Sequence, residues 1–453
     1  MDPSEVNMED KARLVAISTL YDMEINKSFS NIKLNQYFIN YDLSSIDRAF
    51  ATEIVYGTIR WKNKIDYLIQ RNISFKISDV EIWTLICIRS AIYQMFFMDK
   101  VPEFAAVNVA VDLAKMKDVK SAGFVNGILR NILRNREEIN NVGIKNKTKR
   151  LSIQYSHPEW FVRKFQKLYG EDFVIKLMEI NNTPSELTAR VNTLKISRSE
   201  LIEKMAAKGF VVKPGNLDES IILKGYSMIE KSEEFKNGYF IFQDESSMLV
   251  TKVLNPQVND IIIDVCSAPG GKATHIGQVM NNIGEILAFD IYPHKLELIK
   301  NNAEKLGIDI IRALEGNATV FNPELCNLAD RVLIDAPCSG LGLIRKKPEI
   351  RWNMSEEDIV ELSKLQLKIL NNASKYLKPN GILVYSTCTI TEEENEEVIN
   401  NFLKENKNYK LENISSYLPD YYKGENCEAG YIKLFPNINK CDGFFLARLR
   451  KEW

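Results

Sequence analysis

The stretch IIIDVCSAPGGKATHIGQVM, residues 261–280, decides the prediction of the fold. It opens with a short apolar run, passes through Pro269, Gly270 and Gly271, and continues with the apolar spacing of a helix. Short continuous apolar runs are typical of strands that are buried on both faces of a parallel sheet. Glycine lets the backbone of the turn approach a ligand closely, because it has no side chain to obstruct the contact. We therefore expect a strand, a ligand-binding turn and a helix.

The same alternation continues toward the C-terminus. Helical patterns such as HKLELIKNNAEKLG separate further apolar strands: EILAFD (285–290), IIRALEG (310–316), RVLIDAPCSG (331–340) and GILVYSTCT (381–389). Strands that alternate with helices in this way build a parallel sheet that is covered by helices on both faces. The sequence therefore predicts an α/β doubly wound domain over residues 236–453.

Two further parts are predicted on the N-terminal side. Residues 1–140 repeat apolar positions at spacings of three and four, as in KARLVAISTLYDME and VEIWTLICIRSAIYQMFF, which indicates an all-α bundle. The polar stretch NNVGIKNKTKR, residues 140–150, is predicted to be a linker. Residues 150–235 mix helix and strand patterns and are predicted to form a small α+β module. The acidic run from Glu392 to Glu397 is expected to begin a solvated helix.

Composition limits the class of protein. Hydrophobic residues make up 45% and charged residues 26%, which is typical of a folded globular chain. The net charge of -1 does not suggest a nucleic-acid partner, but residues 1–150 hold 22 Lys and Arg against 18 Asp and Glu, so RNA binding fits that part better. Seven cysteines without a CxxC pair argue against a disulfide framework and against a metal site. No apolar run is long enough to cross a membrane.

The N-terminal stretch MDPSEVNMEDKARL has acidic residues and no apolar run, so we do not expect a signal peptide. A cytoplasmic protein with reduced thiols is therefore expected. No feature of the sequence points to a protein partner, and the expected state is a monomer.

A nucleoside cofactor is predicted at the turn. Asp290 ends the next strand, nineteen residues past Gly271, where a carboxylate can accept hydrogen bonds from both hydroxyls of a ribose. The turn lacks the GxGxxG of a dinucleotide site. It also fails as a P-loop, because Cys266 stands where glycine is needed and Ala273 follows the lysine. A tight turn without a ligand is the remaining alternative.

Cys338 and Cys388 each follow a predicted strand, next to Pro337 and Thr387. Because the carboxyl ends of parallel strands meet at one edge of a sheet, both cysteines are expected beside the cofactor turn. A cysteine in an apolar segment is more often a small core residue. That interpretation is given to the cysteines without this context: Cys87, Cys326, Cys427 and Cys441.

The motifs DVCSAPGGK, DAPCSGLG and STCT resemble those of the RNA cytosine-5 methyltransferases. The helical part, with DRAFATEIVYGTIRW, AAVNVAVDLAK and SAGFVNGILRNILR, resembles a NusB-like RNA-binding domain. Together they are similar, over nearly the whole chain, to the bacterial 16S ribosomal RNA cytosine-5 methyltransferase B family, also called Sun or Fmu. The resemblance implies a Rossmann-like class I methyltransferase domain, the cofactor S-adenosyl-L-methionine, 16S ribosomal RNA as partner and 5-methylcytosine as product.

The resemblance also implies catalytic roles. Carbon 5 of cytosine is a poor nucleophile, so a thiolate must first add to carbon 6 and push electron density onto carbon 5. The family's pattern gives this attack to Cys388 and product release to Cys338. The reverse assignment stays open, since DNA cytosine methyltransferases attack with the cysteine of their PC motif. Asp335 is implied to hydrogen-bond nitrogen 3 of the ring, where it would stabilise developing charge, and to border the cofactor.

The implied cofactor contacts are Cys266, Ser267, Ala268, Pro269, Gly270, Gly271, Lys272, Asp290, Asn317 and Asp335. One of them departs from the family's pattern. Asn317 stands in GNA, where the family usually has Asp, although an amide can still accept and donate a hydrogen bond.

RNA contacts are predicted in GLGLIRKKPEIRW, residues 340–352, at Arg345, Lys346, Lys347 and Arg351. Basic side chains there could hold the phosphates that flank an extruded cytosine, and an ordinary exposed loop is the alternative. Two other functions remain open. They are the same chemistry on transfer RNA, and a non-catalytic RNA-binding or antitermination factor.

Overall fold

The computed structural model describes residues 11–26, 30–139, 141–225 and 229–453, which form two compact units. The helical unit contains the described residues up to Thr183 together with Lys347–Asn353, and the second unit contains the rest. The sequence predicted three parts, with boundaries at residues 140–150 and 235–236. These boundaries stay a prediction, because the two units are defined by packing and not by sequence domains. The prediction about a signal peptide falls largely on residues 1–10, which lie outside the described residues.

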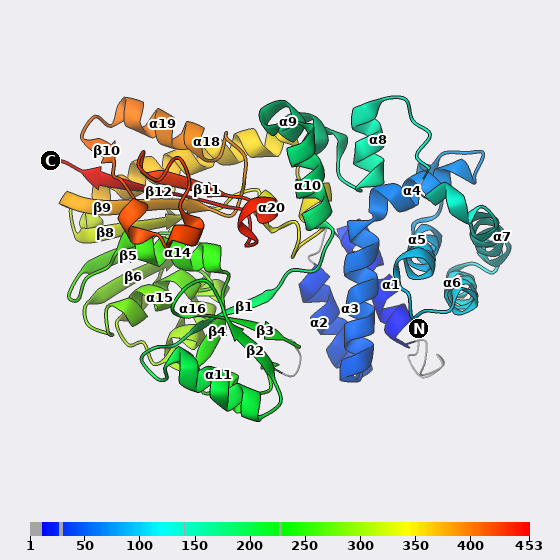
Figure 1. Cartoon of the computed structure of the whole chain (residues 1–453), viewed down its shortest axis with the longest axis horizontal. Coiled ribbons are helices and arrows are strands. Elements are labelled where there is room, and N and C mark those ends of the chain that lie inside the picture. The colour runs from blue at the N-terminus through cyan, green and yellow to red at the C-terminus, as the bar shows by residue number, and fades with distance from the viewer. Residues whose placement is uncertain (1–10, 27–29, 140, 226–228) are drawn as a thin grey trace. The chain divides into compact units, whose positions relative to one another are not determined.

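The helical unit is built from helices alone in the part of the chain that the structure describes (Figure 1). Its long helices are α1 (Lys11–Asn26), α2 (Ser30–Tyr41), α3 (Ser45–Arg60), α4 (Lys62–Arg71), α5 (Ile82–Phe97), α6 (Glu103–Lys117), α7 (Ser121–Arg134), α8 (Lys147–Gln154), α9 (Glu159–Tyr169) and α10 (Glu171–Asn181), and the short α17 (Ile350–Asn353) joins them.

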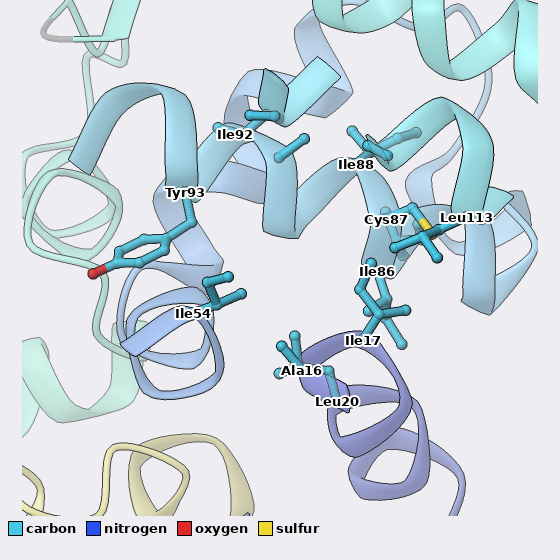
Figure 2. Packing of buried hydrophobic residues seen from close by; sticks show 14 of the residues in the cluster. Ala16, Ile17, Leu20, Ile54, Ile86, Cys87, Ile88, Ile92, Tyr93 and Leu113 are labelled. Atoms are coloured by element: carbon cyan, nitrogen blue, oxygen red, sulfur yellow. The ribbon is translucent and has the colours of Figure 1, made fainter. Parts of the chain in front are cut away.

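The core of this unit lies between α1, α3, α5 and α6. Figure 2 shows Ile17, Ile54, Ile86 and Leu113 from these helices, and each is at most 2% exposed. Helix α3 approaches α5 closely at Gly57, where an added Cβ would overlap the Tyr93 ring. The apolar spacing read from the sequence is therefore the buried face of each helix.

The polar stretch 140–150, predicted to be a linker, is partly helical. Helix α8 begins at Lys147 because the side chain of Asn146 accepts a hydrogen bond from the Lys149 amide at 2.9 Å and caps the helix start. The buried Leu151 and Ile153 then hold α8 against the unit. Residues 147–150 are therefore helical despite their polar composition, because a side-chain cap stabilises the start of α8.

The second unit contains two sheets, and the smaller one has the strand order β2-β3-β1-β4. Its elements are β1 (Leu187–Val191), α11 (Arg198–Ala207), β2 (Val211–Pro214), β3 (Ser220–Lys224), α13 (Glu233–Lys236) and β4 (Phe240–Phe242). The strands pair antiparallel, and Ser197 and Glu200 form a capping box at the start of α11.

The larger sheet has the order β10-β12-β9-β8-β5-β6-β7, with β11 paired to β12. Strands β5 to β9 are parallel, as predicted, while β12 pairs antiparallel with β9. The elements are α14 (Glu245–Leu254), β5 (Ile261–Asp264), α15 (Gly271–Val279), β6 (Glu285–Asp290), α16 (Pro293–Leu306), β7 (Ile311–Glu315), β8 (Ala329–Asp335), α18 (Glu356–Ala373), β9 (Leu377–Thr387), α19 (Glu396–Glu405), β10 (Tyr409–Leu411), β11 (Tyr431–Leu434), α20 (Pro436–Asn439) and β12 (Phe444–Lys451).

Helices cover both faces of the larger sheet (Figure 1). Ile262 belongs to the core under α14, α15 and α16, and its neighbour Ile263 belongs to the core under α18 and α19. Strand order reverses between β5 and β8, and ligands of doubly wound sheets bind at such a switch point, outside the carboxyl ends of the strands. No helix in the described ranges is long and apolar enough to cross a membrane.

Candidate active site

A cavity of about 650 Å³ lies at the carboxyl edge of the parallel strands. Its volume is in the range of small-molecule sites. The wall contains most of the predicted cofactor turn, one of the two cysteines and several residues outside the motifs, among them Asp264, Cys266, Ser267, Ala268, Pro269, Gly271, Lys272, Asp335, Cys388, Gln243, Asp244, Lys346, Asp442 and Phe444.

The turn after β5 is held tightly against the sheet. Gly270 has φ of 94°, and an added Cβ would lie 3.2 Å from the Ile299 Cα. Beneath the turn, the fully buried Arg190 of β1 donates to the Gly271 carbonyl at 2.7 Å and to the Thr274 hydroxyl at 3.0 Å. A glycine and a buried guanidinium thus fix the backbone that would cradle a cofactor.

Three predicted cofactor residues lie outside the cavity wall. These are Gly270, Asp290 and Asn317. Asp290 accepts the Ala268 amide at 3.3 Å, so its carboxylate supports the turn. Asn317 is exposed, and its side-chain oxygen accepts two hydrogen bonds from Thr319, at 3.0 Å from the amide and 2.8 Å from the hydroxyl. Their assignment to the cofactor stays a prediction.

The sulfur atoms of Cys338 and Cys388 are 3.1 Å apart. Strands β8 and β9 run parallel in register, with Asp335 opposite Ser386, so the two cysteine turns leave the sheet side by side. A disulfide would need about 2.05 Å, and both thiols are free. The hydrogen bond with Cys388, together with burial, raises the pKa of the Cys338 thiol well above its ordinary value. Of the pair, Cys388 lines the cavity.

Charged groups converge on the cavity beside the cysteines. The Lys272 ammonium lies 2.6 Å from one oxygen of Asp335, and the Ser386 hydroxyl donates to the other at 2.8 Å. Burial raises the pKa of Asp264 to about 7, and the negative charge of Asp335 acts in the same direction. A cation and two carboxyl groups therefore border the space in front of Cys388.

The cavity wall also contains an ion-pair cluster that no sequence motif indicates. Lys346 lies 2.7 Å from both Asp244 and Asp442. Burial and the charge of Asp244 raise the pKa of Asp442 to about 7, while Lys346 helps to hold the pKa of Asp244 low. Phe444 begins β12 and Asp442 lies two residues before it, where no motif marks them. Their position could be found only from the antiparallel pairing of β12 with β9.

The predicted RNA contacts need correction. Arg351 is fully buried, and its guanidinium donates to the carbonyls of Ser156, at 2.9 Å, and Asn181, at 3.2 Å, inside the helical unit. The prediction is therefore wrong for Arg351. Two carboxylates pair with Lys346 in the cavity wall, and its assignment to RNA stays a prediction. Arg345 donates to the Pro184 carbonyl at 2.5 Å and Lys347 is exposed, so both stay predictions.

The acidic run also differs from its prediction. It does lead into a helix, with Glu396 and Glu397 in the first turn of α19, but Glu394 is fully buried rather than solvated. Its carboxylate contacts both cysteine turns through Ser339 and Thr389. Nothing in a run of acidic letters distinguishes this residue from its neighbours. Among the described residues, no group of three or more His, Cys, Asp or Glu side chains could hold a metal ion.

Family models match all three parts of the chain. The model of 16S rRNA methyltransferase RsmB/F matches residues 251–450, and that of the NusB family matches residues 10–134. A model of the RsmF/B-like methyltransferases, for a ferredoxin-like domain, matches residues 157–230.

Similar proteins cover almost the whole chain. Probable ribosomal RNA small subunit methyltransferase B from Bacillus subtilis is 37% identical over 97% of this chain and 98% of its own length. Ribosomal RNA small subunit methyltransferase B from Klebsiella pneumoniae is 30% identical over 90% of this chain and 91% of its own. The solved structure of PH0851 is 28% identical, covers 99% of both chains and has a TM-score of 0.82. NSun6 from Pyrococcus horikoshii with SFG is 25% identical, covers 65% of this chain and 98% of its own, and has a TM-score of 0.58.

The doubly wound sheet, the glycine turn at its switch point and these matches define an S-adenosylmethionine-dependent methyltransferase. Identity along almost the full length then specifies the family. The chain belongs to the RsmB/F family of 16S rRNA methyltransferases. The predicted resemblance, the fold class with its NusB-like, α+β and Rossmann-like parts, and the cofactor are thereby confirmed.

Proposed function

We propose that the protein transfers a methyl group to carbon 5 of a cytosine in 16S ribosomal RNA, through a covalent bond between Cys388 and carbon 6. One observation carries the proposal. Two cysteines from neighbouring strand ends lie 3.1 Å apart, and Cys388 faces a cavity that also contains Lys272 and Asp335. A cysteine that only fills space in the hydrophobic core would not be expected to face a cavity or to have charged neighbours.

The environments of the two cysteines differ, which supports different roles for Cys338 and Cys388 in the reaction. Because the pKa of Cys338 is raised, its thiol keeps its proton at neutral pH and can donate a hydrogen bond to the Cys388 sulfur. Cys388, the member of the pair that faces the cavity, is therefore proposed as the nucleophile. In this role its sulfur adds to carbon 6 of the base as the thiolate, which is the reactive form of a cysteine nucleophile.

Asp335 is proposed to hold nitrogen 3 of the ring while charge develops, with Lys272 fixing its carboxylate from the other side. Bound S-adenosylmethionine supplies the methyl group of its sulfonium. The proton on carbon 5 then passes to a water molecule or another base in the cavity. The electron pair of the broken C–H bond re-forms the double bond between carbons 5 and 6, and the Cys388 thiolate departs. Cys338 is proposed to assist this release.

The chemistry of the turn fits the cofactor. Gly271 lines the cavity, and the absence of a side chain there leaves room for a ligand. The carboxyls of Asp264 and Asp335 in the cavity wall suit a cofactor with a positive charge. The residues proposed to hold it are Cys266–Lys272, Asp290, Asn317 and Asp335. Arg345, Lys346 and Lys347 are proposed to contact RNA phosphates.

The small-subunit substrate is supported by the names of the relatives from Bacillus subtilis and Klebsiella pneumoniae. The same chemistry on transfer RNA is the alternative within the class, and a non-catalytic RNA-binding factor is the alternative outside it. A ribosomal RNA substrate also implies a cytoplasmic protein, and the monomer expected from the sequence remains part of the proposal.

The decisive experiment is transfer of a tritiated methyl group to unmodified small-subunit RNA by wild type, Cys388→Ala and Cys338→Ala, with denaturing gels to detect covalent complexes. We expect wild type to label cytosine, Cys388→Ala to give neither label nor complex, and Cys338→Ala to accumulate a protein–RNA complex. If Cys388→Ala accumulates the complex instead, the two roles are exchanged. If wild type labels transfer RNA only, the first alternative is correct, and if it labels no RNA, the protein is a binding factor.

A further inference from the structure

The loop between β9 and α19 carries a buried carboxylate that the proposed mechanism does not use. Glu394 is 0% exposed, in contrast to the exposed Glu397 three residues later. Burying a carboxylate is costly unless hydrogen bonds compensate it. The hydrogen-bond partners of the Glu394 carboxylate therefore indicate the role of this residue.

Five donors converge on the Glu394 carboxylate. One oxygen accepts the Ser339 amide at 2.7 Å and the Gln366 side chain at 3.1 Å. The other accepts the hydroxyls of Ser339 at 2.6 Å, Thr391 at 2.7 Å and Thr389 at 3.1 Å. We call these residues the Glu394 network.

Two members of the Glu394 network are direct chain neighbours of the reacting cysteines. Ser339 follows Cys338, and Thr389 follows Cys388. Their hydroxyl oxygens are also 2.8 Å apart, so the single proton of Thr389 can reach either Ser339 or the carboxylate. One side chain thereby ties together two turns that come from different strands.

Further bonds hold the network in place. Gln366 also donates to the Pro337 carbonyl at 2.9 Å, on the other side of Cys338. Asn395 accepts the Thr387 hydroxyl at 2.6 Å and donates to the Thr389 carbonyl at 3.2 Å, so it brackets Cys388. Both cysteine turns are thus fixed on each side by the same loop and by α18.

We propose that Glu394 is a positioning residue, which sets the separation of the Cys388 and Cys338 turns so that attack on carbon 6 and release of the product use one fixed geometry. This inference rests on the proposed function. Misplacing a reacting group by about 1 Å can lower a rate about 100-fold, so a carboxylate that never touches the substrate can still control the reaction.

The test compares full-length Glu394→Gln with Glu397→Gln as a matched control from the same acidic run. Glutamine keeps the shape, but it replaces one acceptor by an NH₂ group that cannot accept the donated hydrogens. Two RNA probes separate the steps. RNA with fluorine on carbon 5 of the target cytosine has no proton to lose after methylation. The covalent complex therefore persists, and its rate of formation reports attack and methyl transfer without release. Unmodified RNA reports the complete cycle.

For Glu394→Gln we expect complex formation on fluorinated RNA to slow by about 100-fold, with unchanged cofactor binding by calorimetry. Glu394→Asp, which keeps the carboxylate at a shorter reach, should recover part of the rate, and Glu397→Gln should behave as wild type. A folded Glu394→Gln protein that forms the complex at the wild-type rate and completes the cycle normally would overturn the inference.

If Glu394→Gln does not fold, two milder variants test the positioning role of Glu394. Thr389→Val should slow complex formation by about tenfold, the effect of one lost hydrogen bond, while Ser339→Ala should mainly slow release from unmodified RNA. Wild-type rates in both would refute the positioning role. Failure of wild type itself to label RNA or form a complex would refute the proposed function instead, so the two failures are distinguishable.

Discussion

Asp264 makes the stability of the methyltransferase unit depend on pH. Its side chain is 1% exposed at the end of β5, and burial raises its pKa from 3.8 to about 7. A shift of about three units corresponds to about 4 kcal/mol between the two protonation states. Between these two pKa values the folded chain keeps a proton on Asp264 that the unfolded chain has released. The free energy of unfolding therefore falls as pH rises through this window, and the loss is complete above about pH 7.

The perturbation that isolates this effect is Asp264→Asn, because asparagine has a similar shape and no charge. Urea unfolding followed by far-UV circular dichroism would compare wild type with the variant at pH 4 and pH 8. We expect the variant to gain stability relative to wild type as pH rises, by up to about 4 kcal/mol at pH 8. Asp218→Asn, at an exposed aspartate of the same unit, is the matched control and should show no such gain. Parallel pH profiles for wild type and Asp264→Asn would refute the reasoning.

Three other predictions follow from the buried charges and thiols. Lys346→Met leaves its two carboxylate partners unpaired, so the second unit should lose about 3 to 5 kcal/mol at pH 8 and less at pH 5, where those groups take up protons, as urea unfolding would show. Arg351→Met leaves buried carbonyl oxygens without their donor, so it should destabilise the helical unit by about 1 to 3 kcal/mol, measured by tryptophan fluorescence, and an unchanged unfolding midpoint would contradict it. Cys388→Ala removes the largest cause of the raised pKa of Cys338, so iodoacetamide should alkylate Cys338 faster in the variant, and an equal rate by mass spectrometry would count against the thiol–thiol bond.

The sheet and the meeting of the two cysteines could be predicted because both follow from local pattern and a general rule of topology. Apolar runs mark the parallel strands, and the carboxyl ends of such strands share one edge. Cys338 and Cys388, separated by 50 positions in the chain, therefore had to approach each other once β8 and β9 were neighbours.

The remaining features depend on partners that no local pattern reveals. Glu394 and Glu397 are the same residue type in one acidic run, and only donors from β8, β9 and α18 decide which is buried. Arg351 follows a basic loop and looks like a phosphate contact, yet backbone carbonyls in the helical unit bind it. Asp442 lies in the cavity wall just before β12, an antiparallel strand that the alternating pattern did not include.

The position of the segment Lys347–Asn353 constrains how the gene can recombine during evolution. It packs with the helical unit, where the Trp352 indole donates to the Ile59 carbonyl at 2.7 Å, although it is encoded within the methyltransferase half of the gene. A gene cut before Pro184 would therefore yield a protein with an indole and a guanidinium stripped of their binding site. Recombination that exchanges the helical half must keep a compatible short segment far downstream. Changes in the helices that surround this segment must therefore be matched by changes far downstream in the same sequence.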